Sequence, residues 1–215
     1  MPDIFTLENK IKQIIDDLKG LCSTNGLSNQ ASEEVVITSV FLYKFLNEFM
    51  SNLKEFAAEL DMDYKDVLKN ENYEMDAFYD SYPQDVAFTY DETIEYLINK
   101  TSNDRFYELF DDALEKISND TKNEASVDTA DGGRKPLFTR ITENVEASKR
   151  NNFAKNIFGI ISQDKFDFGD AFKNNFDFYS TIFEYLIKDY NVASGVYAEY
   201  FTPQAISSII AKILV

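Results

Sequence analysis

The chain has 215 residues, an apolar content of 44% and a net charge of −17. This apolar content is enough for a sizeable core, whereas seven Gly and four Pro provide too few turns for an all-β fold of many short strands. We therefore expect an all-α fold. The acidity argues against nucleic-acid binding by this segment alone, because phosphate neutralisation needs clustered Lys and Arg.

The first third of the sequence predicts two strongly apolar helices. Residues 4–21 carry apolar side chains at the three-and-four spacing of an amphipathic helix, and a polar stretch around Gly26 follows. Residues 32–60 are the most hydrophobic part of the N-terminal half, with apolar side chains on more than one face. We expect one long central helix there, contacted on several sides.

The middle of the sequence is acidic and predicts shorter helices. Residues 54–131 contain 22 acidic against 7 basic residues, whereas residues 141–215 contain 9 against 7. Mixed charged and aromatic residues over 61–82 indicate short helices. Thr89 and Glu92 have capping-box spacing ahead of an apolar stripe that reaches Ile98, which predicts a helix start.

The remaining predicted elements are separated by one long polar loop. Residues 103–117 repeat the amphipathic pattern, and the loop at 118–136 lacks apolar periodicity. Three further segments look helical: residues 137–145, 152–162 and 175–189. The phenylalanines between 166 and 178 alternate with polar residues, and we expect them to fill the core between helices.

The usual signatures of catalytic and metal sites are incomplete in this sequence. The chain has no His, so imidazole-dependent catalysis and zinc binding through His are excluded. We interpret its single cysteine, Cys22, as a small buried residue. The acidic pairs Asp16-Asp17 and Asp111-Asp112 are interpreted as solvated helix faces, because acidic surface is expected at this net charge.

Two segments resemble ligand-binding loops, but neither has the complete motif. Asp61 and Asp63 resemble the start of a calcium loop, but the central glycine is replaced by Asp66 and the twelfth position is Asn72. Gly132-Gly133 is not followed by the spaced glycines of a phosphate-binding loop. The residues themselves therefore indicate a helical, acidic domain without a complete active site.

Two features bear on cellular location. A lone cysteine cannot form an internal disulfide, and the N-terminus lacks the basic and apolar segments of a secretion signal. No apolar run approaches the roughly 18 to 20 residues that a membrane-spanning helix needs. We expect a soluble, cytoplasmic protein without a membrane partner.

The C-terminal end carries a well-marked helix start. Thr202 supplies a hydroxyl N-cap, and Pro203 stands at the first helical position, where its missing N–H is not needed. The following residues are strongly apolar. We interpret this end as an edge within a longer protein whose further elements would cover the apolar face.

The C-terminal third resembles a known junction. Residues 183–187 read Phe-Glu-Tyr-Leu-Ile, and residues 199–203 read Glu-Tyr-Phe-Thr-Pro, with a polar linker between them. This ordered pair, over about 35 residues, resembles type I restriction-modification DNA methyltransferase subunits, the modification or M subunits. The N-terminus is similar to the opening of that family, where one helix precedes a second, hydrophobic helix.

The resemblance implies a division into two parts. Residues 1–190 would form an N-terminal multi-helix bundle, and residues 191–215 would form the linker and first helix of a truncated, Rossmann-like adenine methyltransferase domain. The implied cofactor is S-adenosylmethionine, whose carboxylate suits a helix N-terminus. The residues that would line or flank the methyl-donor site are Glu199, Tyr200, Phe201, Thr202, Pro203 and Gln204. Many relatives have Arg where this sequence has Gln204.

The resemblance also implies what this chain does not do alone. The family needs a glycine-rich cofactor loop and an Asn-Pro-Pro-aromatic motif, and no two prolines are adjacent here. We therefore expect an adenine-N6 methyltransferase in the full-length parent and no catalysis by residues 1–215. The implied partners are the specificity subunit, other M subunits and optionally a restriction subunit, with DNA bound through the full complex.

A different class of function also fits the composition. A stand-alone acidic helical interaction module, or a protein that mimics DNA, explains the charge of −17 without missing catalytic residues. It does not explain the nearly neutral C-terminal third or the Thr-Pro turn.

Overall fold

The computed structural model describes residues 4–28, 31–48, 50–69, 73–83, 85–123, 136–163 and 184–185. Every regular element within these ranges is helical, which confirms the all-α fold class for this part of the chain. The α-helices are α1 (Ile4–Thr24), α2 (Ala31–Glu48), α3 (Ser51–Glu59), α4 (Tyr64–Lys69), α5 (Tyr73–Ser81), α6 (Ile94–Ile98), α7 (Phe106–Asn119) and α9 (Arg150–Ile161). Three 3-10 turns accompany them: η1 (Tyr90–Glu92), η2 (Thr121–Asn123) and η3 (Ile141–Asn144).

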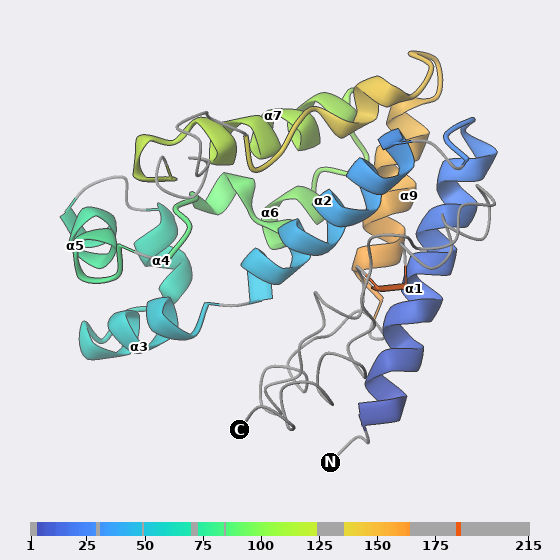
Figure 1. Ribbon diagram of the computed structural model, residues 1–215. Helices are drawn as coiled ribbons and strands as arrows, with labels where there is room; N and C mark the ends of the chain where they lie inside the picture. Colours follow the sequence, from blue (N-terminus) through green and yellow to red (C-terminus); the bar gives the residue numbers. More distant parts are fainter. Residues whose placement is uncertain are drawn as a thin grey trace, which may run out of the picture.

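Four helices share the main core. Helix α9 contacts α1, α2 and α7, and the shorter helices α3 to α5 lie at the opposite end of α2 from α1 (Figure 1). The buried residues of α9 recur three and four positions apart, which brings them onto one broad apolar face: Phe153, Ala154, Ile157, Phe158 and Ile161. The helices predicted over residues 4–21, 103–117 and 152–162 are confirmed as α1, α7 and α9.

Aromatic rings make the contact between α7 and its neighbours. The ring of Phe158 lies edge-on to Phe106 and Phe110, with centroids 4.9 and 5.0 Å apart. Tyr43 of α2 approaches Phe110 at 5.7 Å. Edge-to-face pairs of this kind add about 0.5–1.5 kcal/mol each to the free energy of area burial. Helices α2, α7 and α9 are therefore held by one aromatic cluster.

The prediction of one helix over residues 32–60 is wrong. The helix stops at Glu48 and restarts at Ser51, and the backbone of Met50 leaves the helical conformation (φ −113°, ψ 33°). The break lets the Met50 side chain enter the core, where it is 6% exposed, and lets α3 pack on α4. Near the end of α2, the side-chain oxygen of Asn47 accepts from the N–H of Ile94 (2.7 Å), which ties this end of the helix to α6.

The prediction of a helix over residues 137–145 is also wrong, because residues 137–140 are not helical and side chains of α7 bind the backbone of this segment. Ser118 Oγ donates to the carbonyl of Phe138 (3.0 Å) and accepts from its N–H (2.7 Å). Seven residues earlier on α7, the Asp111 carboxylate accepts from the N–H (3.2 Å) and the hydroxyl of Thr142. The segment therefore runs antiparallel to α7 and closes only one 3-10 turn, η3.

Asp111 consequently differs from the solvated acid that its sequence neighbourhood predicts. Its side chain is 1% exposed, and burial raises the pKa of its carboxyl group. Asp112 does lie on the surface, where Arg140 Nη1 bridges it and Glu115 at 2.7 Å each. The two adjacent acids thus face different environments, and Asp111 serves to fix the chain along α7.

The capping box is confirmed in part. The N–H of Thr89 donates to Glu92 Oε2 (2.7 Å), as the spacing predicts, but these residues form η1 instead of starting a longer helix. Helix α6 has its own cap, because Thr93 Oγ1 accepts from the N–H of Tyr96 (3.1 Å). In the part of the chain described here, no helix has the length and hydropathy to cross a membrane.

Candidate interaction surface

The predicted methyl-donor site lies outside the described residues. Its six residues are Glu199, Tyr200, Phe201, Thr202, Pro203 and Gln204. The Thr-Pro helix start, the phenylalanines between 166 and 178 and most of the helix expected over 175–189 also lie outside the described residues. Of the segment at 183–187, Glu184 and Tyr185 are described and have helical backbone. Of the two C-terminal segments that carry the resemblance, the structure therefore describes only these two residues.

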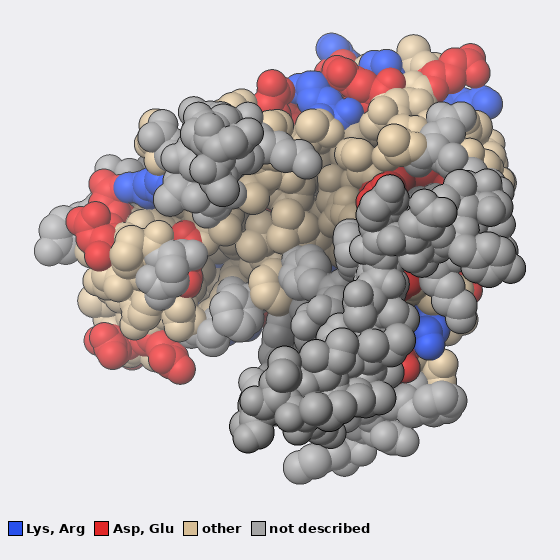
Figure 2. Space-filling view, viewed as in Figure 1, with Lys and Arg blue, Asp and Glu red and all other residues tan. Residues whose placement is uncertain are grey.

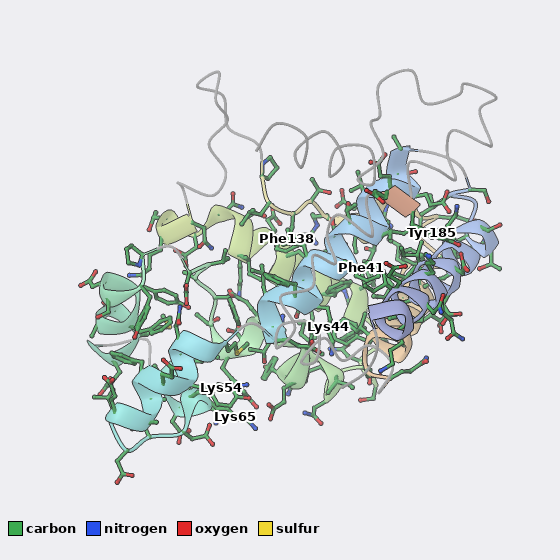
Figure 3. All side chains as sticks on the ribbon, turned by 60° about the horizontal axis from the view of Figure 1, so that its bottom comes forward. Phe41, Lys44, Lys54, Lys65, Phe138 and Tyr185 are labelled. Atoms are coloured by element: carbon green, nitrogen blue, oxygen red, sulfur yellow. The ribbon has the colours of Figure 1, made fainter. Side chains whose placement is uncertain are left out.

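Tyr185 lies against the first helix of the chain (Figure 3). Its hydroxyl donates to Asp16 Oδ1 at 2.9 Å, which joins positions 169 residues apart. Partial burial and the Asp16 carboxylate raise the pKa of the Tyr185 hydroxyl, so it keeps its proton as a hydrogen-bond donor. Asp16 is thus both solvent-exposed, as predicted, and the partner of a residue from the C-terminal third.

We expect the Tyr185 contact to be measurable as a coupling energy. Tyr185→Phe and Asp16→Ala each remove the same hydrogen bond, so the double variant should lose less stability than the sum of the single variants, by about 0.5–1 kcal/mol. Urea unfolding of the three variants measures this difference. Strict additivity of the two single losses would show that the hydrogen bond contributes nothing.

Acidic side chains gather at the end of the molecule formed by α3 and α5 (Figure 2). The exposed carboxylates on these helices and the turn that follows α3 belong to Glu55, Glu59, Asp61, Asp63, Asp76 and Asp80. Asp76 pairs with Lys122 Nζ at 2.7 Å, whereas no described Lys or Arg lies within ion-pair distance of Glu55, Glu59 or Asp80. We call this region the acidic end.

Lysines near the acidic end lie over tyrosine rings. The ammonium group of Lys54 lies 5.5 Å from the ring centre of Tyr64, and that of Lys69 lies 4.7 Å from Tyr90. Figure 3 shows Lys54 close to Lys65, whose Nζ pairs with Glu95 at 2.6 Å. Each cation–π contact is worth about 0.5–1 kcal/mol at an exposed site. These lysines therefore stabilise the packing of α3, α4 and η1.

An apolar cavity of about 180 Å³ opens between α2, α3 and α5. Its lining residues are Phe45, Leu46, Met50, Leu53, Phe78, Tyr79, Asp85, Val86 and Phe88. Asp85 is the one charged group among them, and Asn52 Nδ2 donates to both of its carboxylate oxygens (3.1 and 3.0 Å). Sequence reasoning did not identify this cavity, because its walls come from four separate segments.

A second hollow, of about 160 Å³, borders the first. It is lined by Tyr79, Asp80, Pro83, Asp85 and Lys122. Tyr79 and Asp85 therefore belong to both hollows. Its lining carries the two carboxylates of Asp80 and Asp85 against the one ammonium group of Lys122, which pairs with Asp76 outside the lining, so the second hollow is acidic on balance.

The environment of the one cysteine, Cys22, indicates a structural role and not a catalytic one. Burial, with a smaller contribution from the charge of Glu33, raises the pKa of the Cys22 thiol to about 12, so the reactive thiolate is disfavoured at neutral pH. The interpretation of Cys22 as a buried residue is confirmed by an exposed fraction of 0%. The described residues contain no cluster of three or more metal-ligating side chains.

The carboxyl group of Glu92 has a strongly raised pKa. Burial raises the pKa of Glu92 to about 7, and the negative charge of Asp91 acts in the same direction. The N–H of Thr89 and the ammonium group of Lys116 oppose the shift. Because its carboxylate accepts from the N–H of Thr89, the residue before η1, and borders neither hollow, we assign Glu92 to the structure of this turn.

In the part of the chain that the structure describes, these observations define an all-α protein with a four-helix core and an acidic, hollowed end. Comparison with known proteins adds no family to this description. No family model matches the chain, and no curated protein or solved structure is similar enough to match it.

Proposed function

We propose that this chain is the N-terminal helical part of the modification subunit of a type I restriction-modification system, and that it mediates assembly with the partner subunits. The full-length parent would be an adenine-N6 DNA methyltransferase that uses S-adenosylmethionine. Residues 1–190 would then hold the complex together, whereas residues 199–204 would begin the methyl-donor site.

The contact between Tyr185 and Asp16 is the observation that supports this proposal most. The family resemblance rests on two separate segments, the opening helices and the Phe-Glu-Tyr-Leu-Ile segment, and this hydrogen bond joins one to the other. A helical bundle is also the architecture that the resemblance implies for this part of the family. The assembly role is consistent with the acidic end, which offers uncompensated carboxylates to a basic partner surface.

Association with the specificity subunit tests the assembly role. The full-length parent, co-expressed with that subunit, would carry Glu55→Gln, Glu59→Gln and Asp61→Asn at the acidic end. We expect association to weaken roughly threefold to tenfold at low salt, with a smaller effect at high salt, because exposed charges are screened. Pull-down at matched salt concentrations measures the effect.

A matched control removes three charges elsewhere. Asp104→Asn, Glu143→Gln and Glu146→Gln change the net charge equally near the start of α7, at η3 and before α9, away from α3 (Figure 1). We expect association to be unaffected by this control. Equal loss in both variants, or no loss in either, would contradict an assembly role for the acidic end.

The second candidate is a stand-alone acidic interaction module, including a DNA mimic. The exposed carboxylates of Glu55, Glu59 and Asp80 favour it, because no described Lys or Arg lies within ion-pair distance of them and such a surface suits a basic partner of any kind. The genomic reading frame discriminates between the two functions. Continuation beyond residue 215 into a glycine-rich loop and an Asn-Pro-Pro-aromatic motif supports the methyltransferase, and a stop codon there supports the module.

A further inference from the structure

We propose that the two adjoining hollows at the acidic end bind a two-residue anchor of a partner protein. An aromatic or branched apolar side chain enters the apolar cavity, and a neighbouring Lys or Arg side chain enters the acidic hollow between Asp80 and Asp85. The identity of the partner as another subunit of the complex rests on the proposed function. The chemistry of the anchor rests on the two hollows alone.

The size and lining of the cavity select the apolar half of the anchor. A cavity of roughly 150 Å³ lined by apolar side chains can hold a benzene molecule. The space of about 180 Å³ between α2, α3 and α5 is therefore large enough for one phenyl ring or one leucine side chain. Its walls are deeply buried residues such as Leu53 (3% exposed) and Phe78 (2% exposed), so an inserted ring meets a preformed apolar surface.

The basic half of the anchor follows from charge complementarity. Asp85 receives two hydrogen bonds from Asn52, which is neutral, and no described Lys or Arg lies within ion-pair distance of its carboxylate. Asp80 is exposed beside it in the second hollow. Lys122 also lines this hollow, where it pairs with Asp76, so the lining carries two carboxylates against one ammonium group. This net negative charge favours an incoming cation over an incoming anion.

The anchor belongs to a protein surface because the acidity continues beyond the hollows. Helix α3 lines the cavity with Leu53 and presents Glu55 and Glu59 to solvent. A small molecule that fills the hollows would not contact the carboxylates of Glu55 and Glu59. A basic polypeptide surface would extend over the hollows and pair with these carboxylates as well. Apolar anchors surrounded by complementary charge are the usual arrangement of specific protein interfaces.

Short peptides test the anchor on the chain itself. Acetyl-Phe-Arg-amide is titrated into the full chain with methyl-labelled methionine, since the sequence has only four Met and Met50 lines the cavity. We expect the Met50 methyl resonance to shift and saturate, with little change at Met62. Acetyl-Phe-Glu-amide should bind about tenfold more weakly, and acetyl-Ala-Arg-amide should produce no shift of Met50.

Three variants locate the binding. Asp80→Asn with Asp85→Asn should remove the preference for the Arg peptide over the Glu peptide, because asparagine keeps the hydrogen bond from Asn52 and loses the charge. Asp61→Asn with Asp104→Asn removes two exposed charges that line neither hollow and should preserve the preference. Val86→Phe fills the cavity from its rim and should abolish the Met50 shift, provided that circular dichroism shows an unchanged fold.

The outcomes separate this inference from the proposed function. Absence of a Met50 shift up to the solubility limit of the Arg peptide, or equal affinity for the Arg and Glu peptides, overturns the anchor site even if the specificity subunit still associates. Selective binding of the Arg peptide supports the site even if that subunit fails to associate.

Discussion

Asn123→Ala is expected to lower the free energy of unfolding by about 3–5 kcal/mol, although the sequence places this residue in a polar loop. Its side chain is 1% exposed and makes three hydrogen bonds to backbone groups. Oδ1 accepts from the N–H of Ala87 (2.7 Å), and Nδ2 donates to the carbonyls of Ala87 (2.8 Å) and Ile117 (2.7 Å).

The reason for this large effect is that alanine leaves buried backbone groups without partners. Each unsatisfied buried group costs about 1–3 kcal/mol, and water entering the vacated space would recover part of that loss. Urea unfolding analysed by linear extrapolation measures the change. The dependence on urea should keep its slope, because the variant changes a contact and leaves the surface exposed on unfolding nearly the same.

Asn119→Ala is the matched control for this prediction. Asn119 is the last residue of α7, four positions before Asn123, and its side chain is exposed. Truncating it should change stability by less than about 0.5 kcal/mol. A loss below about 1 kcal/mol for Asn123→Ala would mean that the three backbone groups find other partners.

The amphipathic helices could be predicted because burial is encoded in their spacing. The apolar residues of α1, α7 and α9 recur every three or four positions, and each stripe faces the common core. The break between α2 and α3 has no comparable signal. Neither Gly nor Pro stands between Glu48 and Ser51, so the interruption depends on the tertiary positions of Met50 and Asn47.

Long-range polar contacts explain the second failure of prediction. The segment from Phe138 to Thr142 has local features of a helix, but Ser118 and Asp111 bind its backbone from 20 and 31 residues away. A periodicity argument compares only neighbours in sequence and cannot include such partners. The same limit hid the role of Asn123 and the burial of Asp111.

Only the part of the candidate surface that lies in a recognisable sequence motif could be predicted. The sequence drew attention to Tyr185 through its resemblance to a family segment, but not to its partner Asp16. The two hollows were not predictable at all. Asp85 follows a proline turn with no distinctive spacing, and its neighbours in space come from α2, α3 and α5. Cavities form where packing is incomplete, which depends on the relative placement of whole helices.

The carboxyl group of Glu92 is expected to make stability depend on pH. Its pKa is about 7 in the folded protein against an ordinary value of 4.5, so the folded state holds the proton more tightly than the unfolded state. Below pH 4.5 both states are protonated and the burial of Glu92 carries no charge cost. Between pH 4.5 and 7 the unfolded state ionises first, so stability falls as pH rises.

Glu92→Gln should therefore stabilise the protein at pH 8 by about 2–3 kcal/mol and have little effect at pH 4. Glutamine keeps an oxygen that accepts from the N–H of Thr89, and it removes the negative charge from a site that is 6% exposed. The difference in unfolding free energy between the variant and the wild type, measured by urea titration from pH 4 to 8, isolates this group from other titrating residues.

Lowering the net negative charge could stabilise an acidic protein without any specific site, and Glu55→Gln separates the two causes. It removes the same charge from an exposed position of α3. A specific effect of Glu92 predicts a pH-dependent gain that exceeds that of Glu55→Gln at pH 8. Equal gains for the two variants, or a Glu92→Gln gain that is the same at pH 4 and pH 8, would place the effect in overall charge repulsion instead. The Tyr43 hydroxyl, which donates to the carbonyl of Glu92 (2.6 Å), retains its partner in the variant, so η1 should stay attached to α2 throughout.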